Sequence, residues 1–362
     1  MRAIAFALVA IVLLDPVAAA GQRVPSMRTA GRAVTPRGPL LTTEQATIDL
    51  FEKARASVTY ISTQSRVVDA WTRNVFSVPR GTGSGFVWDA GGHVVTNYHV
   101  LAGASSARVR FSDGRDVAAS LVGVSLAPDL AVLKVTLDRM PPPLPLGTSH
   151  DLRVGQTTFA IGNPFGLDFT LTTGIVSALD RALPAEDGRS LIEHLIQTEN
   201  PGNSGGPLLD SAGRLIGVNT AIFSPSGASS GVGFAVPADT VNRVVPQLIA
   251  RGRYIRAGLG VHVDDQLNQL ITRRLGVTGV VILRAPVGSA AETAGLRGVR
   301  PQSDGSVLAG DVIVAVDGQP VDSVPRLTGR LDDHEVGDTV TLTVLRDDAR
   351  RDVRVRLQAE TP

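Results

Sequence analysis

The chain has 362 residues, with 35 Lys and Arg against 34 Asp and Glu, so its formal net charge of +1 gives no electrostatic footprint for nucleic acid. It has no cysteine, which excludes disulfides, thiol catalysis and cysteine-ligated zinc. Its 43% hydrophobic residues and 38 glycines are typical of a β-rich globular protein with room for two or three domains.

The N-terminus has the pattern of a secretory signal peptide. Arg2 precedes an apolar run from Ala3 to Leu14, and the small residues at 18–20 resemble a cleavage site. The run is about twelve residues long, whereas a membrane-spanning helix needs roughly 20, so an uncleaved anchor is the less favoured alternative. We therefore expect residues 1–20 to be removed and the mature protein to be exported, into the periplasm where the host has two membranes.

A linker and a helix are expected before the first domain core. Residues 21–42 are rich in Gly, Pro and Arg and lack apolar periodicity, which predicts a flexible linker. From Thr43 onward, apolar residues recur at helical spacing and predict a short amphipathic helix that ends before Val58. This helix would cap a barrel or lie at a subunit contact.

From Ser57 to Val236 the chain alternates short strand-like runs with Gly-containing turns. The runs are rich in β-branched and aromatic residues and include residues 58–61, 85–88, 93–96 and 107–111. This pattern predicts an antiparallel sandwich or barrel, and the length suits two small barrels packed together. Gly81–Gly85 resembles a phosphate loop, but neither a helix pattern nor a Lys follows it, so a glycine-rich strand entry is the favoured interpretation.

A second, smaller domain is expected at the C-terminus. Apolar residues from Val241 to Ile249 at helical spacing, ended by Gly252, predict a helix at the boundary. The remaining chain contains roughly five strand-like runs and two helical segments, enough for a complete domain. The expected strands lie near residues 259–263, 279–283, 311–316, 339–345 and 352–357, and the expected helices near 289–294 and 324–331.

The stretch from Glu199 to Leu208 has the layout of an acyl-transfer serine. Ser204 is flanked by Gly-Asn and Gly-Gly, and small neighbours let a backbone approach a substrate carbonyl closely. The N–H groups of Gly202 and Ser204 are therefore candidate oxyanion-hole donors. An ordinary tight turn between two strands is the alternative interpretation of this stretch.

Upstream residues complete a possible catalytic triad. His99 lies at the end of a predicted strand, and Asp129 lies immediately before a predicted buried strand. Taken singly, each is explained equally well as a structural or turn residue. With Ser204 they follow the order His, Asp, Ser of chymotrypsin-type enzymes, on a β-rich background that suits such a triad.

From about Thr43 to Leu357 the sequence resembles the HtrA/Deg family of trypsin-like serine proteases with a single C-terminal PDZ domain, and it is most similar to the chloroplast-type branch. The resemblance is carried by residues 83–101, 129–135, 160–166, 173–177, 202–208 and 224–234, and in the PDZ part by 258–260, 294–296 and 309–313. It implies a mainly β fold. The expected order is a chymotrypsin-like double β-barrel protease domain at 43–252 and a PDZ domain, a β-sandwich with two helices, at 253–362.

The resemblance also implies roles for the candidate residues in the protease domain. Ser204 would be the nucleophile, His99 the general base and acid, and Asp129 the orienting carboxylate, with no metal or cofactor required. Trypsin-like folds line the pocket for the substrate side chain with a segment that here reads Asn219, Thr220, Ala221 and Ile222. This segment carries no charge, which favours small or medium apolar substrate side chains.

In the PDZ domain, the resemblance implies a peptide-binding groove. Gly258, Leu259, Gly260 and Val261 would offer N–H groups to a peptide C-terminus and add the peptide as a further strand. The expected helix near 324–331 would form the other wall. A PDZ fold that serves only subunit packing is the alternative.

One departure from the family pattern affects the functional expectation. The family reads Thr-Asp-Ala-Ala-Ile-Asn-Pro-Gly-Asn-Ser before the nucleophile, whereas this chain reads Thr198-Glu199-Asn200-Pro201-Gly202-Asn203-Ser204 and is shorter by about three residues. The leading hypothesis is an ATP-independent endopeptidase that degrades unfolded proteins as a homotrimer or larger assembly. The alternative is a chaperone or peptide-binding protein that retains the protease fold with weak or no catalysis.

Overall fold

The computed structural model describes residues 32–68, 72–126, 128–164, 166–184, 191–200, 203–220, 231–301, 307–308 and 310–360. The predicted signal peptide and the first part of the predicted linker lie outside these residues. The chain divides into two units, residues 1–41 and 42–362, and residues 32–41 have no regular secondary structure. No helix within the described ranges is both long and apolar enough to cross a membrane.

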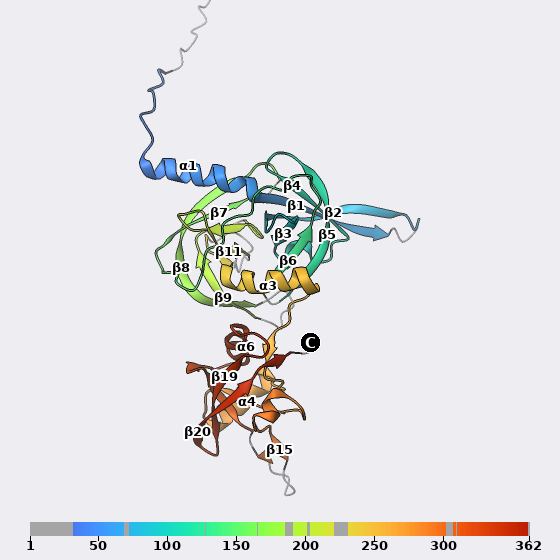
Figure 1. Ribbon diagram of the computed structural model, residues 1–362, viewed down its shortest axis with the longest axis vertical. Helices are drawn as coiled ribbons and strands as arrows, with labels where there is room; N and C mark the ends of the chain where they lie inside the picture. The colour runs from blue at the N-terminus through green and yellow to red at the C-terminus, as the bar shows by residue number, and fades with distance from the viewer. Residues whose placement is uncertain are drawn as a thin grey trace, which may run out of the picture. The chain divides into compact units, whose positions relative to one another are not determined.

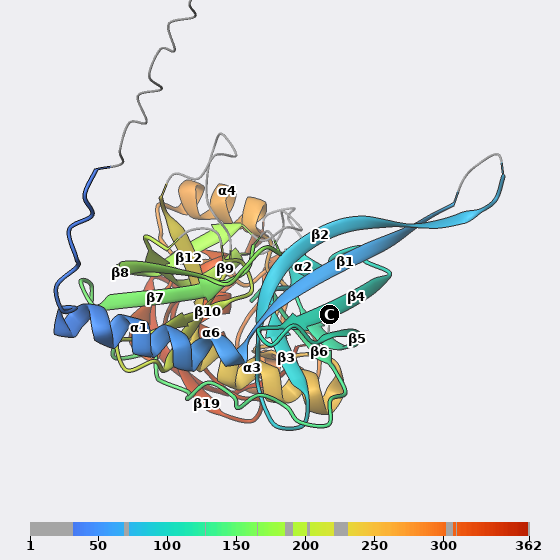
Figure 2. The same cartoon turned by 90° about the horizontal axis from the view of Figure 1, so that it is seen from above.

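The expected N-terminal helix is α1, Thr42–Ala54, followed by one 3₁₀ turn, Arg55–Ser57, and then by β1 (Figure 2). Glu44 in its first turn and Lys53 in its last turn complement the helix dipole. Ala54 is buried, and Leu50 and Phe51 pack against the protease core. Leu50, Phe51 and Ala54 of the predicted apolar stripe thus pack onto the barrels, whereas Ile48 is 42% exposed.

The first barrel is closed and has the strand order β1-β2-β3-β6-β5-β4. Its strands are β1 (Val58–Val68), β2 (Val75–Val87), β3 (His93–Thr96), β4 (Ser106–Phe111), β5 (Asp116–Ser125) and β6 (Leu130–Lys134). Alternating residues such as Ile61, Val109 and Phe111 fill its interior. Gly81–Gly85 lies inside β2, which begins at Val75, so this glycine-rich stretch is part of a strand but not its entry. Strands β1 and β2 extend beyond the barrel as a long hairpin (Figure 1).

The second barrel is also closed and has the order β10-β11-β12-β9-β8-β7. Its strands are β7 (Thr157–Gly162), β8 (Thr170–Pro184), β9 (Leu191–Thr198), β10 (Pro207–Leu209), β11 (Leu215–Asn219) and β12 (Gly233–Pro237). The short strands β10, β11 and β12 are buried throughout. The candidate nucleophile Ser204 lies in the turn just before β10, so the barrel wall directly supports it.

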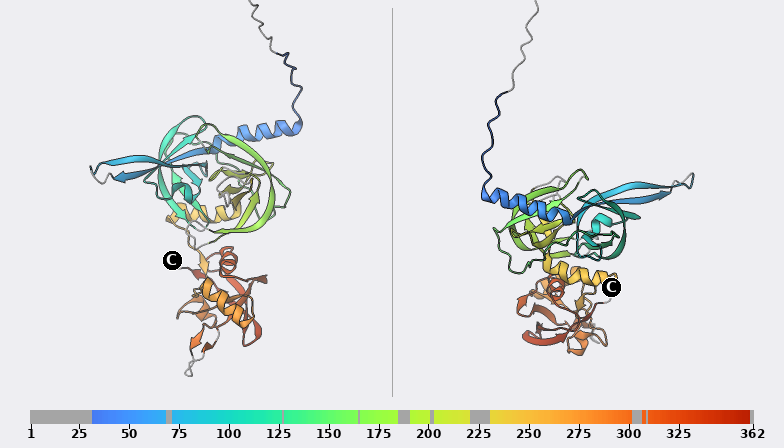
Figure 3. Two further views of the ribbon diagram at one scale, coloured as in Figure 1. Left: turned by 180° about the vertical axis from the view of Figure 1, so that it is seen from behind. Right: turned by 45° about the horizontal axis from the view of Figure 1, so that its top comes forward.

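Helix α3, Ala238–Arg251, joins the two barrels (Figure 3). It contacts β5 and β6 of the first barrel and β11 and β12 of the second. Its five buried residues are Ala238, Val241, Val244, Val245 and Leu248. Gly252 ends the helix with a left-handed φ of 73°, which a residue with a side chain adopts only with strain.

The C-terminal part is built on a five-stranded antiparallel sheet, in which β14, β17, β19 and β20 follow one another and β18 pairs with β17. The sheet consists of β14 (Val280–Val281), β17 (Val312–Val316), β18 (Gln319–Pro320), β19 (Thr339–Arg346) and β20 (Ala349–Arg356). Two further pairs form separate two-stranded sheets: β13 (Ala257–Gly258) with β21 (Gln358–Ala359), and β15 (Arg300–Pro301) with β16 (Val307–Leu308). The helices are α4 (Asp265–Leu275), α5 (Ala290–Thr293) and α6 (Val324–Asp332).

The C-terminal part differs from the expectation in two places. Helix α4 was not predicted, although its apolar residues Leu267, Leu270, Ile271 and Leu275 recur at helical spacing; in the structure Leu267 and Leu270 are exposed and Asn268 is buried. Its ends also carry local signals, since Asp264 caps the N-terminus and Gly276 the C-terminus. The strand expected over residues 259–263 is reduced to β13 and one isolated bridge at His262.

Candidate active site

Asp129 and His99 come together at the end of the first barrel. His99 lies on the short helix α2, Tyr98–Leu101, which directly follows β3, and Asp129 immediately precedes β6. The backbone N–H of His99 donates to Asp129 Oδ1 at 3.0 Å, and His99 Nδ1 lies 2.7 Å from Asp129 Oδ2. One carboxylate oxygen therefore holds the backbone of His99, and the other fixes the orientation of its ring.

The carboxylate of Asp129 is held by its surroundings as well as by His99. It is 5% exposed, and its backbone has a left-handed φ of 53°. Its carbonyl accepts from Asn97 Nδ2 at 2.9 Å and from the N–H of Tyr98 at 3.2 Å. The hydroxyl of Thr220, from the second barrel, donates to Asp129 Oδ2 at 2.5 Å. The orientation of Asp129 therefore depends on both barrels.

Ser204 lies between the two barrels and is fixed by backbone contacts to each. Its Oγ donates to the carbonyl of Thr220 at 3.1 Å, and its own carbonyl accepts from the N–H of Ser84 on β2 at 2.8 Å. Gly205 follows with a φ of 82°, and a Cβ there would overlap the carbonyl oxygen of Ser84. Only glycine fits next to the serine in this conformation.

The remaining protease-site residues predicted from the sequence are placed only in part. Gly202, Ala221 and Ile222 lie outside the described residues. Asn219 is 3% exposed, and its Nδ2 donates to the carbonyls of Gly206 and Pro207 at 3.1 and 3.0 Å. The side chains of Asn219 and Thr220 thus support the serine turn and Asp129. Sequence reasoning placed Thr220 in the pocket wall and missed its contact with Asp129, because the two residues are 91 positions apart.

The four PDZ residues predicted to bind peptide lie at and just after β13. Leu259 is 1% exposed, its side chain belongs to the core of the C-terminal part, and its carbonyl accepts from Ala291 N. Gly258 is buried and pairs with Gln358 of β21, and Gly260 has a φ of 68°. Val261 is partly buried against the same core. Any peptide contact of Leu259 would therefore come from its backbone.

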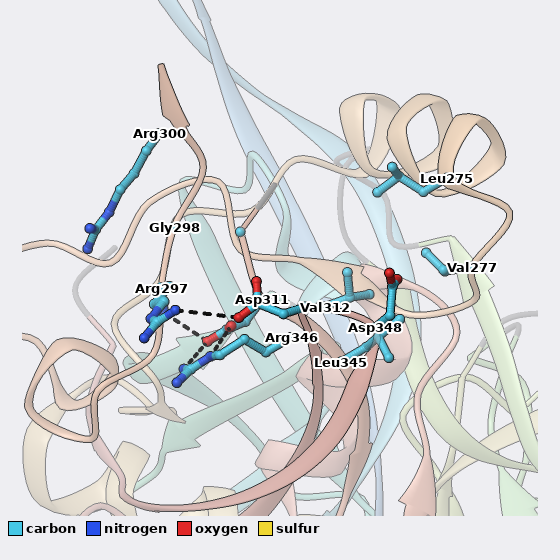
Figure 4. A pocket seen from close by; sticks show the side chains of 12 residues that line it. Leu275, Val277, Arg297, Gly298, Arg300, Asp311, Val312, Leu345, Arg346 and Asp348 are labelled. Carbon is cyan, nitrogen blue, oxygen red and sulfur yellow. Dashed lines mark hydrogen bonds and ion pairs between the residues drawn. The ribbon is translucent and has the colours of Figure 1, made fainter. Parts of the chain in front are cut away.

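A hollow in the C-terminal part, of about 220 Å³, lies around a buried ion pair rather than beside Gly258 (Figure 4). Arg346 donates to Asp311 Oδ1 from Nε at 2.7 Å and to Oδ2 from Nη2 at 2.6 Å. Asp311 is 1% exposed and also accepts from the N–H of Arg297 at 2.8 Å. The bidentate pair satisfies this carboxylate and ties β19 to the loop before β17.

Glu193 of β9 is the described carboxyl group whose protonation changes most clearly near neutral pH. Burial raises the pKa of Glu193 to about 7, although the nearby His194 and Arg326 favour the charged form. His194 Nδ1 lies 2.8 Å from Asp180 Oδ1, and Arg326 of α6 lies 3.1 Å from the other oxygen of the same carboxylate. Among the described residues, no group of three or more metal-ligating side chains is assembled.

Two family models match the double-barrel part and the C-terminal part of the chain. Residues 83–218 match the trypsin-like peptidase domain, and residues 257–357 match the PDZ domain. Protease Do-like 1, chloroplastic, from Arabidopsis thaliana is 47% identical over 325 residues, which cover 88% of this chain and 73% of that protein. Probable periplasmic serine endoprotease DegP-like from Halomonas elongata is 43% identical over 282 residues, which cover 76% of this chain and 56% of that protein.

Solved structures give the same picture of the fold. The HtrA-type protease AlgW with a decapeptide aligns with a TM-score of 0.66 at 33% identity and covers 89% of this chain and 100% of its own. The same protease with a tripeptide aligns with a TM-score of 0.64 at 35% identity and covers 87% and 97%. The double barrel and the PDZ fold expected from the sequence are confirmed.

Proposed function

Since the chain belongs to the HtrA/Deg family of trypsin-like serine proteases, and is a serine endopeptidase, we propose that Ser204 is its nucleophile, His99 its general base and acid, and Asp129 the carboxylate that orients His99. The observation that carries this proposal is the position of Thr220. Its hydroxyl donates to Asp129 and its carbonyl accepts from Ser204, so one residue links both ends of the triad.

The chemistry follows from these positions. Ser204 Oγ attacks the scissile carbonyl and gives its proton to His99 Nε2, and the resulting imidazolium is stabilised by Asp129 at its Nδ1 side. The backbone N–H groups of Gly202 and Ser204 stabilise the negative charge on the carbonyl oxygen. His99 then protonates the leaving amine, and water hydrolyses the acyl-enzyme by the reverse proton transfers.

The proposed substrates are unfolded or misfolded proteins, in keeping with a role in protein quality control. The names of the DegP-like relatives support a periplasmic location, and export through residues 1–20 is part of the proposal. The Arabidopsis relative is named as a chloroplast protein. The peptides in the AlgW structures support peptide recognition by this family, which we assign to the PDZ domain at 253–362. The protease domain is assigned to 43–252, and assembly to a homotrimer or larger oligomer.

The shortened segment before Ser204 supports one alternative. A chain that holds this segment in an unproductive conformation would bind unfolded proteins without cleaving them. The test combines an active-site-directed phosphonate with casein digestion, using the wild type and Ser204→Ala. We expect labelling at Ser204 and cleavage by the wild type, and turnover lower by about 10⁶-fold in the variant, with an unchanged melting temperature.

The outcomes of this test separate the two functions. If the wild type is neither labelled nor able to digest casein, yet prevents the aggregation of an unfolded protein, the binding function holds. If Ser204→Ala digests casein as fast as the wild type, the assignment of the nucleophile is wrong. Light scattering on the same samples gives the oligomer mass.

A further inference from the structure

The side-chain amide of Asn200 is buried two residues after β9 and has a partner at every polar position. Asn200 is 2% exposed. Its Oδ1 accepts from Thr198 Oγ1 at 3.0 Å and from Thr158 Oγ1 at 3.3 Å. Its Nδ2 donates to the carbonyl of Thr172 at 3.1 Å and, with a longer contact, to that of Thr158 at 3.5 Å. Because an amide offers two acceptor sites and two donor hydrogens, these contacts use the whole side chain.

The neighbouring strands leave room for this amide. A Cβ at Gly174 of β8 would overlap Asn200 Oδ1, and a Cβ at Gly233 of β12 would come within 3.0 Å of the Asn200 carbonyl oxygen. Gly174 is not among the residues with positive φ, so the space that it leaves, rather than its backbone freedom, explains the glycine. Gly174 belongs to the segment 173–177 that the sequence singled out without a role.

Asn203 lies on the other side of residues 201–202 and, like Asn200, contacts Thr172 of strand β8. It is 2% exposed, and its Nδ2 lies 3.4 Å from Thr172 Oγ1. Its carbonyl accepts from the N–H of Gly206 at 2.8 Å, which closes the turn that contains Ser204. Thr172 therefore receives Asn200 at its carbonyl and Asn203 at its hydroxyl.

We propose that Asn200 and Asn203 are positioning residues of the acyl-transfer site, which anchor both ends of the segment before Ser204 to Thr172. The inference rests on the proposed role of Ser204 as the nucleophile. Asn203 directly precedes Ser204, so its anchor to Thr172 and its bond to Gly206 restrict the direction of the Ser204 N–H, one of the two proposed oxyanion donors.

The two anchors, Asn200 and Asn203, lie in the stretch before Ser204 that is shorter than the family pattern. Backbone donors contribute to catalysis only when they point at the position of the oxyanion, and a displacement of about 1 Å costs roughly 10²-fold in rate. A neutral amide suits Asn200 because two hydroxyl donors and two carbonyl acceptors surround it. A carboxylate of the same shape would place negative charge against the two carbonyls.

The test measures the rate at which a small phosphonate labels Ser204 in the full chain, together with kcat and KM for a peptide substrate. We expect Asn200→Ala to label about 10²-fold more slowly and to lose kcat with little change in KM. Thr172→Val, which removes only the hydroxyl, should lose about tenfold, whereas Thr172→Ser should keep the wild-type rate.

Asn268→Ala is the matched control. Asn268 is 3% exposed in the PDZ domain and is bonded to the carbonyl of Gly279 and the N–H of Val281, so its loss has a similar structural cost far from Ser204. This variant should melt earlier yet label at the wild-type rate. If Asn200→Ala and Asn268→Ala lower labelling equally, or if Asn200→Ala labels normally, the positioning role is wrong.

Asn200→Asp keeps the inference testable if Asn200→Ala does not fold. When protonated, the introduced carboxyl group can donate to one carbonyl, and when ionised it can donate to none, so the labelling rate relative to wild type should fall as pH rises from about 5 to about 8. A constant ratio contradicts the inference. Absence of labelling in the wild type itself contradicts the proposed function instead, which separates the two failures.

Discussion

Replacing Thr220 by Val removes the hydroxyl that donates to Asp129 Oδ2 at 2.5 Å but keeps the shape of the side chain. The carbonyl of Thr220, which accepts from Ser204 Oγ, belongs to the backbone and stays in place. The substitution therefore tests a single contact of the triad. We expect a lower rate because Asp129 loses a side-chain donor that reaches it from the second barrel.

The size of the effect follows from the contacts that remain. A hydrogen bond to a charged group contributes about 1.5–3 kcal/mol, and each 1.4 kcal/mol corresponds to about tenfold in rate. Asp129 keeps its two contacts with His99, at 3.0 and 2.7 Å, so the carboxylate still orients the ring. We therefore expect kcat/KM to fall by about 10- to 100-fold, well below the roughly 10⁴-fold known for replacing a triad carboxylate itself.

The assay is steady-state cleavage of a fluorogenic peptide by the wild type, Thr220→Val and Thr220→Ser. The Ser variant keeps the hydroxyl and should retain most of the activity, while thermal melting checks that both variants are folded. If Thr220→Val stays within about twofold of the wild type, the hydroxyl does not support catalysis and the reasoning from the 2.5 Å contact fails.

Two further predictions concern stability. Because burial raises the pKa of Glu193 to about 7, its ionisation destabilises the folded chain as pH rises from about 4.5 to 7. Glu193→Gln should therefore raise the free energy of unfolding by about 1 kcal/mol at pH 8, a value reduced because the side chain is partly exposed, and by almost nothing at pH 4.5. Equal shifts of the urea midpoint at both pH values would contradict this prediction. Arg346→Met should cost about 3–5 kcal/mol in urea unfolding, because Asp311 is 1% exposed and loses both bidentate contacts, and Asp311→Leu in addition should restore part of the loss. A cost below about 1 kcal/mol would show that Asp311 finds another partner.

Much of the fold was accessible from local patterns. Apolar residues at helical spacing predicted α1 and α3, and the glycine at 252 ends α3 with a φ of 73°. Strand-like runs separated by turns predicted β1, β2, β3 and β4 of the first barrel. Helix α4 was missed although its sequence carries both kinds of signal, since its leucines recur at helical spacing and Asp264 and Gly276 cap its ends.

The residue types of the candidate site could be predicted from the sequence, but the hydrogen bonds that hold these residues in place could not. The sequence indicated His99, Asp129 and Ser204 from their chemistry, their order along the chain and the family resemblance. It contained no sign that the hydroxyl of Thr220 would meet Asp129 or that Asn200 would be fully buried against β7 and β8. These contacts join segments that are distant along the chain, so no local period or motif encodes them.

By itself, then, the sequence determined many of the strands, most of the helices and the three chemical groups of the proposed triad, because hydrophobic periodicity and the reactivity of side chains are local properties. Only the tertiary structure decided which polar groups hold that triad in place. Closing two barrels brings Thr220 to Asp129 and Thr172 to the segment before Ser204. A buried polar group must find its partner wherever packing places one, and that choice depends on the whole fold.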